Sequence, residues 1–138
     1  MSVFLDTNIL LYCFDESEVD KRPVALELIA KLLQGNESVM ISTQVAIEFL
    51  NRVQRSKSPP TQRTAQVESL QLFHCQPTTI NTVRAAWALS SAHTVSWFDA
   101  LIVQSALDAN CSQLYSEDLQ GGRVFSGRLT VINPFEPT

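Results

Sequence analysis

Short apolar runs that alternate with longer amphipathic segments constrain this chain of 138 residues more than any other feature. The runs that are typical of short buried strands are Val3–Leu5, Val39–Ile41, Gln113–Tyr115, Leu129–Ile132 and, more weakly, Leu72–Cys75. Strands that alternate with helices indicate an α/β fold with a mostly parallel sheet that helices cover on both faces. We therefore expect a central sheet of about five strands.

The helices are predicted from the spacing of apolar residues and from capping residues. Their expected ranges are Ile9–Tyr12, Pro23–Leu33, a segment that Ser42 caps, about Thr61–Leu72, Asn81–Ala92 and Trp97–Ala109. Thr7 or Asn8 is expected to cap the first helix. In the fifth helix, Val83, Ala86 and Trp87 are expected to face the core.

The composition argues against several classes of protein. Hydrophobic residues make up 45% of the chain and charged residues 17%, which disfavours disorder. No apolar run approaches the roughly 20 residues of a membrane span, and no secretory signal is visible. The 3 cysteines form no disulfide or zinc pattern, so we expect reduced thiols in a cytoplasmic protein. No repeat or shift in composition divides the chain, so residues 1–138 are expected to form a single domain.

Charge is sorted along the chain rather than spread evenly. The formal net charge of −4 disfavours a protein that binds nucleic acid through bulk charge alone. The stretch from Asn51 to Gln66, however, contains no Asp or Glu. Its basic residues are Arg52, Arg55, Lys57 and Arg63. The chain as a whole is therefore mildly acidic, but this stretch has a local excess of positive charge.

Two acids follow predicted strands. Asp6 comes directly after Val3–Leu5, and Asp118 comes shortly after Gln113–Tyr115. Ligands of open α/β sheets bind beyond the carboxyl ends of the strands, so both acids are candidate site residues. Each also has a purely structural interpretation: Asp6 can cap the next helix, and Asp118 can be an ordinary turn residue before Gly121.

Asp99 is the only charged residue between Trp97 and Leu107, in a predicted helix that is apolar on nearly every face. A carboxylate in such surroundings is costly unless something stabilises it. Ser96 and Asp99 also fit a capping box. The two interpretations are compatible, because a helix that begins near the strand ends can cap itself and still present a carboxylate there.

Glu48 lies at the rim of the apolar face of its predicted helix, beside Arg52. A surface ion pair between these two side chains, four residues apart, is the alternative to a role in a site. The sequence leaves both interpretations open.

Taken together, the acids suggest a site for a hard cation. Two carboxylates about 4 Å apart repel each other by roughly 4 kcal/mol at an effective dielectric constant near 20. Mg²⁺ or Mn²⁺ removes that repulsion, takes oxygen ligands and keeps bound water. His74 and His93 are isolated, and the sequence has neither a Gly-rich phosphate loop nor a G-x-S-x-G elbow.

A set of short motifs, in this order and spacing, resembles the PIN domain. The motifs are Phe4–Asn8, the helical Glu48, Trp97–Ile102 and Tyr115–Asp118. The match extends to the closing Asn133–Phe135 and so covers nearly the whole chain. The size and build look like the VapC toxins of bacterial and archaeal toxin–antitoxin modules.

The resemblance implies a three-layer domain in which the Asp6 strand lies beside the Asp118 strand at the centre of the sheet. The residues that match the family's acidic positions are Asp6, Glu48, Asp99 and Asp118. The residues that match its orienting polar positions are Thr7 or Asn8, and Ser116. Glu117 is an additional acid that could serve as an alternative or water-mediated ligand.

The implied reaction is hydrolysis of RNA phosphodiester bonds with one or two Mg²⁺ or Mn²⁺ ions. Asp6 and Asp99 would bind metal directly, and Asp118 would do so directly or through water. Glu48 would position or deprotonate the attacking water. The residues that would contact RNA are Arg52, Arg55, Lys57 and Arg63. The implied protein partners are a small antitoxin that fills the site and a second copy of the chain.

Other functions fit the residues less well. A PIN-like module could bind RNA or a partner without cutting it. A haloacid-dehalogenase-like phosphatase also places an Asp after its first strand, but it requires a second Asp two residues later, where this chain has Asn8. A response-regulator receiver is disfavoured similarly, since no acidic pair follows the first strand beyond Asp6.

Overall fold

The computed structural model describes residues 1–137 and arranges them around a six-stranded sheet in the order β3-β2-β1-β4-β6-β5. The strands are β1 (Ser2–Leu5), β2 (Ser38–Ser42), β3 (His74–Gln76), β4 (Cys111–Tyr115), β5 (Val124–Phe125) and β6 (Leu129–Ile132). Every neighbouring pair is parallel except β5 and β6, which are antiparallel. The prediction of a mostly parallel sheet is confirmed.

Two strands differ from the prediction. The strand expected near Leu72–Cys75 begins later, at His74, because the chain first makes a 3₁₀ turn over Leu70–Leu72. The sequence did not predict β5, which is only two residues long. This strand depends on a turn in which Ser126 and Gly127 both have positive φ, at 53° and 65°. A two-residue strand next to such a turn is too short to show hydrophobic periodicity, so the sequence pattern does not predict it.

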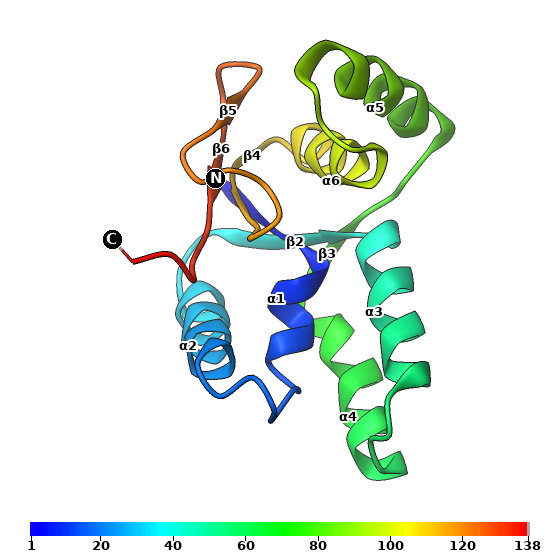
Figure 1. Cartoon of the computed structure of the whole chain (residues 1–138), viewed down its shortest axis with the longest axis vertical. Coiled ribbons are helices and arrows are strands. Elements are labelled where there is room, and N and C mark those ends of the chain that lie inside the picture. Colours follow the sequence, from blue (N-terminus) through cyan, green and yellow to red (C-terminus); the bar gives the residue numbers. More distant parts are fainter. Residues whose placement is uncertain (138) are drawn as a thin grey trace.

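The helices lie on both faces of the sheet. They are α1 (Thr7–Tyr12), α2 (Lys21–Gln34), α3 (Thr43–Arg55), α4 (Pro60–Ser69), α5 (Ile80–His93) and α6 (Trp97–Asp108). Figure 1 shows α5 and α6 on one side of the strands and α1 to α4 on the other, which gives three layers. Right-handed crossovers explain this division, because the chain moves outward from β1 to β3 and then crosses to β4 on the opposite side of β1.

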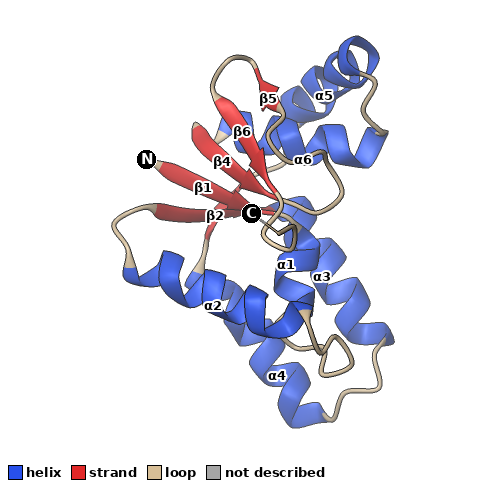
Figure 2. Ribbon diagram, turned by 60° about the vertical axis from the view of Figure 1, so that its left-hand side comes forward, coloured by secondary structure: helices blue, strands red, loops and turns tan. Residues whose placement is uncertain are grey.

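The strands β1 and β4 are neighbours at the centre of the sheet, and Figure 2 shows them side by side between β2 and β6. One half of the chain builds outward from β1 through β2 to β3, and the other half from β4 through β6 to β5. The carboxyl ends of β1 and β4 therefore form the topological switch point of the sheet, where ligands of such folds bind. The sheet order implied by the family resemblance is confirmed.

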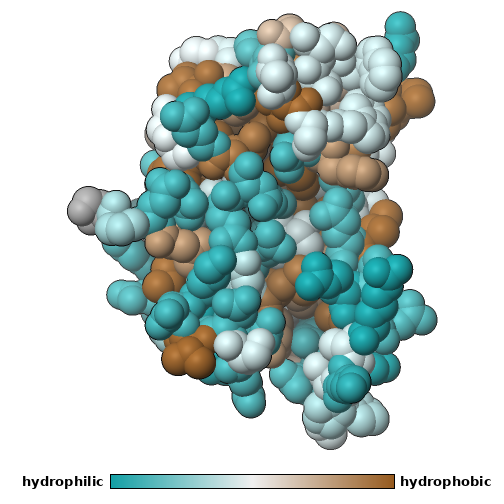
Figure 3. Space-filling view, in the orientation of Figure 1, coloured by the Kyte–Doolittle hydropathy of each residue, from teal (hydrophilic) through white to brown (hydrophobic). Residues whose placement is uncertain are grey.

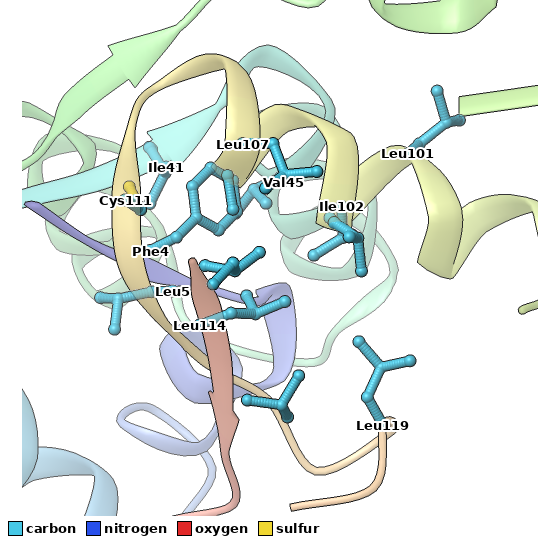
Figure 4. Close-up of a cluster of buried hydrophobic side chains, with 14 of the residues drawn as sticks. Phe4, Leu5, Ile41, Val45, Leu101, Ile102, Leu107, Cys111, Leu114 and Leu119 are labelled. Atoms are coloured by element: carbon cyan, nitrogen blue, oxygen red, sulfur yellow. The ribbon is translucent and has the colours of Figure 1, made fainter. Parts of the chain in front are cut away.

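Strand β1 is buried along most of its length, as expected for a central parallel strand covered on both faces. Val3, Phe4 and Leu5 are each 0% exposed. Figure 4 shows the side chains that surround this strand, among them Ile41 of β2, Val45 of α3, Ile102 and Leu107 of α6, and Leu114 of β4. Burial of each side chain of this size contributes about 1.5–3 kcal/mol. Strand β1 is therefore firmly held, and it fixes the position of Asp6, the residue that follows it.

The caps agree with the sequence at α3 and α6, and at α1 the structure has the alternative in which Asp6 is the capping residue. Ser42 Oγ accepts from Val45 N at 3.2 Å, as predicted. The expectation that Thr7 or Asn8 caps the first helix was wrong: Thr7 is already helical, and Asp6 is the extended residue at the boundary, with ψ 159°. Asp6 Oδ1 accepts from Thr7 N at 2.7 Å.

The inward face of α5 was also predicted incorrectly in part. Trp87 is 67% exposed and packs edge-on against Trp97, with ring centroids 5.6 Å apart. Ala86 is fully buried as predicted, and Leu89 joins it. Apolar residues occupy more than one face of this helix, so spacing alone did not identify the face that packs on α6.

Two further findings bear on the class of protein. Among the described residues, no helix is long and apolar enough to cross a membrane. Cys13 and Cys111 are buried free thiols, and Cys75 is exposed. Burial raises the pKa of the Cys13 thiol to about 11 and that of Cys111 to about 12, so both stay neutral.

Candidate active site

A cavity of about 270 Å³ lies beyond the carboxyl ends of the central strands. The acidic residues in its wall are Asp6, which follows β1, Glu48 on α3, Asp99 in the first turn of α6, and Asp118, which follows β4. The acids that match the family's acidic positions therefore meet at one site, although they come from separate parts of the chain, whereas Glu117 is not in the wall of this cavity.

Asp6 is the most buried of these acids, at 5% exposure. Its carboxylate accepts hydrogen bonds from Thr7 N at 2.7 Å and from Ser116 Oγ at 2.8 Å. Burial raises the pKa of Asp6 to about 7, the two hydrogen bonds oppose the rise, and the charges of Asp118 and Asp99 add to it. This carboxylate is therefore buried beside like charges, and it forms no ion pair with a cationic side chain of residues 1–137.

Glu48 points into the cavity rather than along the surface of its helix. Thr7 Oγ1 donates to Glu48 Oε2 and Gln44 Nε2 donates to Glu48 Oε1, each at 2.8 Å. No ion pair with Arg52 forms within residues 1–137, so the surface-pair alternative was wrong. Two donors on two different oxygens fix the plane of this carboxylate.

Asp99 lies in the capped first turn of its helix and also faces the cavity, but the predicted capping box is only half formed, because the hydrogen bonds of residues 1–137 include none from Ser96 N to the Asp99 carboxylate. Ser96 caps α6, and its Oγ donates to Asp99 Oδ2 at 2.8 Å. The carboxylate is half-buried at the wall of the cavity, not enclosed by apolar side chains. The energetic cost argued from the sequence was therefore too high, because the N-terminal turn of a helix also favours negative charge.

Asp118 is the most exposed member of the set. Asn8 Nδ2 donates to its carboxylate at 3.4 Å. Partial burial raises the pKa of Asp118, and the charges of Asp99, Glu117 and Glu48 raise it further. Ser116 is fully buried and connects the two strand ends, because its hydroxyl donates to Asp6 and accepts from Asp118 N at 3.1 Å.

Glu117 points away from the cavity and is absent from its wall. Lys21 Nζ forms an ion pair with its carboxylate at 2.9 Å, and the Tyr12 hydroxyl donates to it. Burial and this hydrogen bond to Glu117 raise the pKa of Tyr12, which keeps the hydroxyl a donor. Glu117 therefore anchors α1 and α2 to the loop after β4, and the suggestion that it is an alternative metal ligand finds no support.

The sequence reasoning missed Gln44, Tyr12 and Lys21. Gln44 lies four residues before Glu48 on α3, so the spacing of helical side-chain pairs could have identified it. Lys21 and Glu117 are 96 residues apart, and no local pattern connects them.

The predicted RNA-contacting residues divide into two groups. Arg52 lines the acidic cavity, and Arg55 and Lys57 line a larger neighbouring cavity. Arg63 points inward, where its guanidinium donates to Ser58 O at 3.1 Å and to Ser56 O at 2.6 Å. Arg63 therefore holds the loop between α3 and α4, and it is absent from the walls of both cavities.

The donor set of the acidic cavity fits a hard divalent cation. Its acidic side chains offer only oxygen ligands, and Asp6 is buried without a compensating charge. In the part of the chain that the structure describes, no three Asp, Glu, His or Cys side chains already form a metal cage. Mg²⁺, which usually keeps several waters and binds through one or two carboxylates, suits such an open arrangement.

The PIN domain profile matches residues 3–124. A chain of a toxin–antitoxin complex from Klebsiella pneumoniae superposes with a TM-score of 0.75 at 19% identity, over 99% of this chain and 100% of that one. VapC20 from Mycobacterium tuberculosis, described as a sarcin–ricin loop cleaving toxin, gives 0.68 at 18% identity, over 83% and 88%.

Another similar structure is VapBC2 of Rickettsia felis bound to a DNA fragment from its promoter, with a TM-score of 0.62, 24% identity, and coverage of 84% of this chain and 86% of that one. No curated protein matches the chain significantly in sequence. Structural similarity at these identities shows the fold alone. The profile match covers most of the chain, however, and the chain therefore belongs to the PIN domain family.

Proposed function

We propose that this protein is a metal-dependent ribonuclease and the toxin of a toxin–antitoxin pair. The observation that carries the proposal is the convergence of Asp6, Glu48, Asp99 and Asp118 on one cavity at the switch point of the sheet. Carboxylates gathered in this way repel one another and leave Asp6 buried without a counter-charge, and a divalent cation removes both costs.

The acids divide into metal ligands and a water-positioning group. A bound Mg²⁺ or Mn²⁺ lowers the pKa of coordinated water and neutralises charge that develops on a scissile phosphate. Asp6 and Asp99 would hold the ion directly, and Asp118 would do so directly or through water. Glu48, whose plane is fixed by Thr7 and Gln44, has oxygen lone pairs left to accept a proton from the attacking water. No covalent enzyme intermediate is involved.

The substrate is proposed to be RNA, held through phosphate contacts beside the acidic cavity. Arg52, Arg55 and Lys57 are exposed, and none takes part in an ion pair within residues 1–137. Such cations offset the repulsion between a polyanion and a carboxylate site. The similarity to VapC20, described as a toxin that cleaves the sarcin–ricin loop, supports RNA as the polymer.

An antitoxin and a second copy of the chain are the proposed protein partners. The similar structures from Klebsiella pneumoniae and Rickettsia felis are toxin–antitoxin assemblies, which supports the first. Exposed Trp87 and Ile80, at 67% and 70%, give α5 an apolar surface that pairing of two chains in the cytoplasm would cover. Light scattering on the purified chain measures this assembly directly.

The nuclease proposal is tested by incubating purified protein with RNA in Mg²⁺ or Mn²⁺. We expect cleavage that EDTA stops and that Asp6→Asn and Asp99→Asn each abolish. Glu27→Gln removes an exposed acid of α2 and serves as the matched control with unchanged cleavage. Cleavage that persists in EDTA, or in both Asn variants, would contradict the proposal, and RNA binding without any cleavage would favour a non-catalytic module.

A further inference from the structure

A second cavity, larger than the acidic one, lies beside the acidic site and is not used by the proposed chemistry. It has a volume of about 570 Å³ and lies between the loop after α1, the end of α3 and the start of α4. This volume falls within the range of roughly 300–1,000 Å³ that is usual for sites of small ligands. Leu11 and Arg52 line both cavities, so the two cavities adjoin each other.

The walls of this second cavity combine an apolar base with a basic rim. Phe14 contributes an aromatic ring that is only partly buried and tilts against Phe49 at a centroid distance of 6.1 Å. Arg52, Arg55 and Lys57 form the rim on the α3 side. Figure 3 shows hydrophilic groups at the lower right of the molecule, where α3 ends and α4 begins. A polar mouth with cations suits a nucleic-acid strand better than the apolar face of a protein helix.

Gln66 gives the cavity a buried polar group without a partner. This wall residue is 5% exposed, and its carbonyl oxygen has no hydrogen-bond partner among residues 1–137. The oxygen atom itself is enclosed, so a ligand reaches it only when the Gln66 side chain rotates toward the cavity. An unpaired buried acceptor costs about 1–3 kcal/mol, so pairing with an N–H donor of a ligand favours that rotation. Every nucleobase has such a donor on its Watson–Crick edge, and proteins that read single-stranded RNA pair with that edge.

The acids of the opposite wall limit where a phosphate can lie. Asp15 and Glu16 belong to the loop after α1, and Asp15 is held by Ser17 N at 3.0 Å. Phosphates are repelled from this side and attracted to Arg55 and Lys57 on the other. The strand would therefore run along the α3 side, with a base directed between the walls.

We propose that this cavity binds one unstacked nucleotide of the RNA substrate next to the scissile bond, with the base against Phe14 and Gln66 and the flanking phosphates against Arg52, Arg55 and Lys57. The inference rests on the proposed ribonuclease function and deepens it, because it assigns a base-binding subsite to a region outside the acidic cavity. A nuclease with this subsite requires single-stranded or unpaired RNA on at least one side of the cut.

The test uses short single-stranded RNAs in which an abasic residue is placed, in turn, at each position around the cut. One position next to the scissile bond should raise KM at least about fivefold, the range expected for loss of one stacked base, with kcat little changed. Gln66→Leu should raise KM for the intact RNA and have no further effect on that abasic RNA, because both changes remove the same contact. Independent, additive effects of the two changes would overturn the subsite.

The basic rim is tested separately, through the salt dependence of RNA binding in two variants that each lose one positive charge. Arg55→Gln and Lys31→Gln each remove one exposed positive charge, but Lys31 lies on α2 and is absent from both cavity walls. The logarithm of the RNA association constant falls linearly with the logarithm of the salt concentration. Arg55→Gln should make this slope shallower by about 0.7, the value for one phosphate contact on a single strand, and Lys31→Gln should leave the slope unchanged.

The outcomes separate this inference from the function on which it rests. If the wild-type protein does not cleave RNA, the proposed function fails. If it cleaves RNA but KM is the same for every abasic substrate and for Gln66→Leu and Arg55→Gln, the subsite is overturned while the nuclease stands. The remaining interpretation of the cavity would then be a binding site for a protein partner.

Discussion

Ser116 shows how much of the site depends on a single buried hydroxyl. It is 0% exposed, donates to Asp6 Oδ2 and accepts from Asp118 N, and so couples the acids that follow β1 and β4. Polar groups behind the ligands commonly hold metal-binding carboxylates in place. The sequence marked Ser116 only through the family resemblance, since a serine after a strand has no distinctive local pattern.

Replacement of this hydroxyl should weaken both the fold and the metal site. Ser116→Ala removes the donor to Asp6 Oδ2 and the acceptor of Asp118 N, which should lower the free energy of unfolding by about 1–3 kcal/mol. It should also lower Mn²⁺ affinity, measured by the metal concentration at half-maximal cleavage. Ser105→Ala is the control, because Ser105 is equally buried but donates only to Leu101 O of its own helix. Equal effects of the two variants would contradict the role of Ser116.

Gln44 should act as a positioning residue for Glu48. Gln44→Leu removes the donor to Glu48 Oε1, and because hydrogen bonds to charged groups contribute about 1.5–3 kcal/mol, kcat should fall roughly tenfold or more. The thermal stabilisation by Mn²⁺ should persist, since Gln44 is not a proposed ligand. Gln54→Leu changes an exposed glutamine of the same helix and should leave kcat unchanged. A rise in KM with constant kcat would assign Gln44 to substrate binding instead.

At the scale of elements, local signals predicted most helices and failed where tertiary contacts decide. The Ser42 and Ser96 caps and the periodicity of α3 are local, and the structure contains them. The exposure of Trp87 and the two-residue strand β5 depend on packing and on a tight turn. The direction of Arg63 also depends on a loop fold that the charge pattern does not specify.

Arg63 should stabilise the junction between α3 and α4. Arg63→Ala removes the donors to the carbonyls of Ser56 and Ser58 and should lower the free energy of unfolding in urea by about 1–3 kcal/mol. Arg55→Ala, on an exposed side chain of the same region, should change that free energy by less than about 0.5 kcal/mol. If the two variants unfolded at the same urea concentration, the loop contacts of Arg63 would be unimportant.

At the scale of the whole molecule, the site exists because distant segments meet at the switch point between β1 and β4. Asp6 and Asp118 could be placed at strand ends from the sequence, but their proximity requires the strand order, which only the family resemblance supplied. The orientation of Glu48 toward Thr7, and of Glu117 toward Lys21, is fixed by contacts between elements. The acid set was therefore predictable, whereas the role of each member was not.

A thermal unfolding titration with Mn²⁺ tests for the metal site by reporting metal binding without relying on activity. Metal at about one hundred times its dissociation constant should add about 2.7 kcal/mol to the stability of the wild-type protein and raise Tm by several degrees. Asp6→Asn and Asp99→Asn should lose this shift, and Glu27→Gln should keep it. An unchanged Tm across millimolar Mn²⁺, or the same shift in all three variants, would contradict a metal site built from these carboxylates.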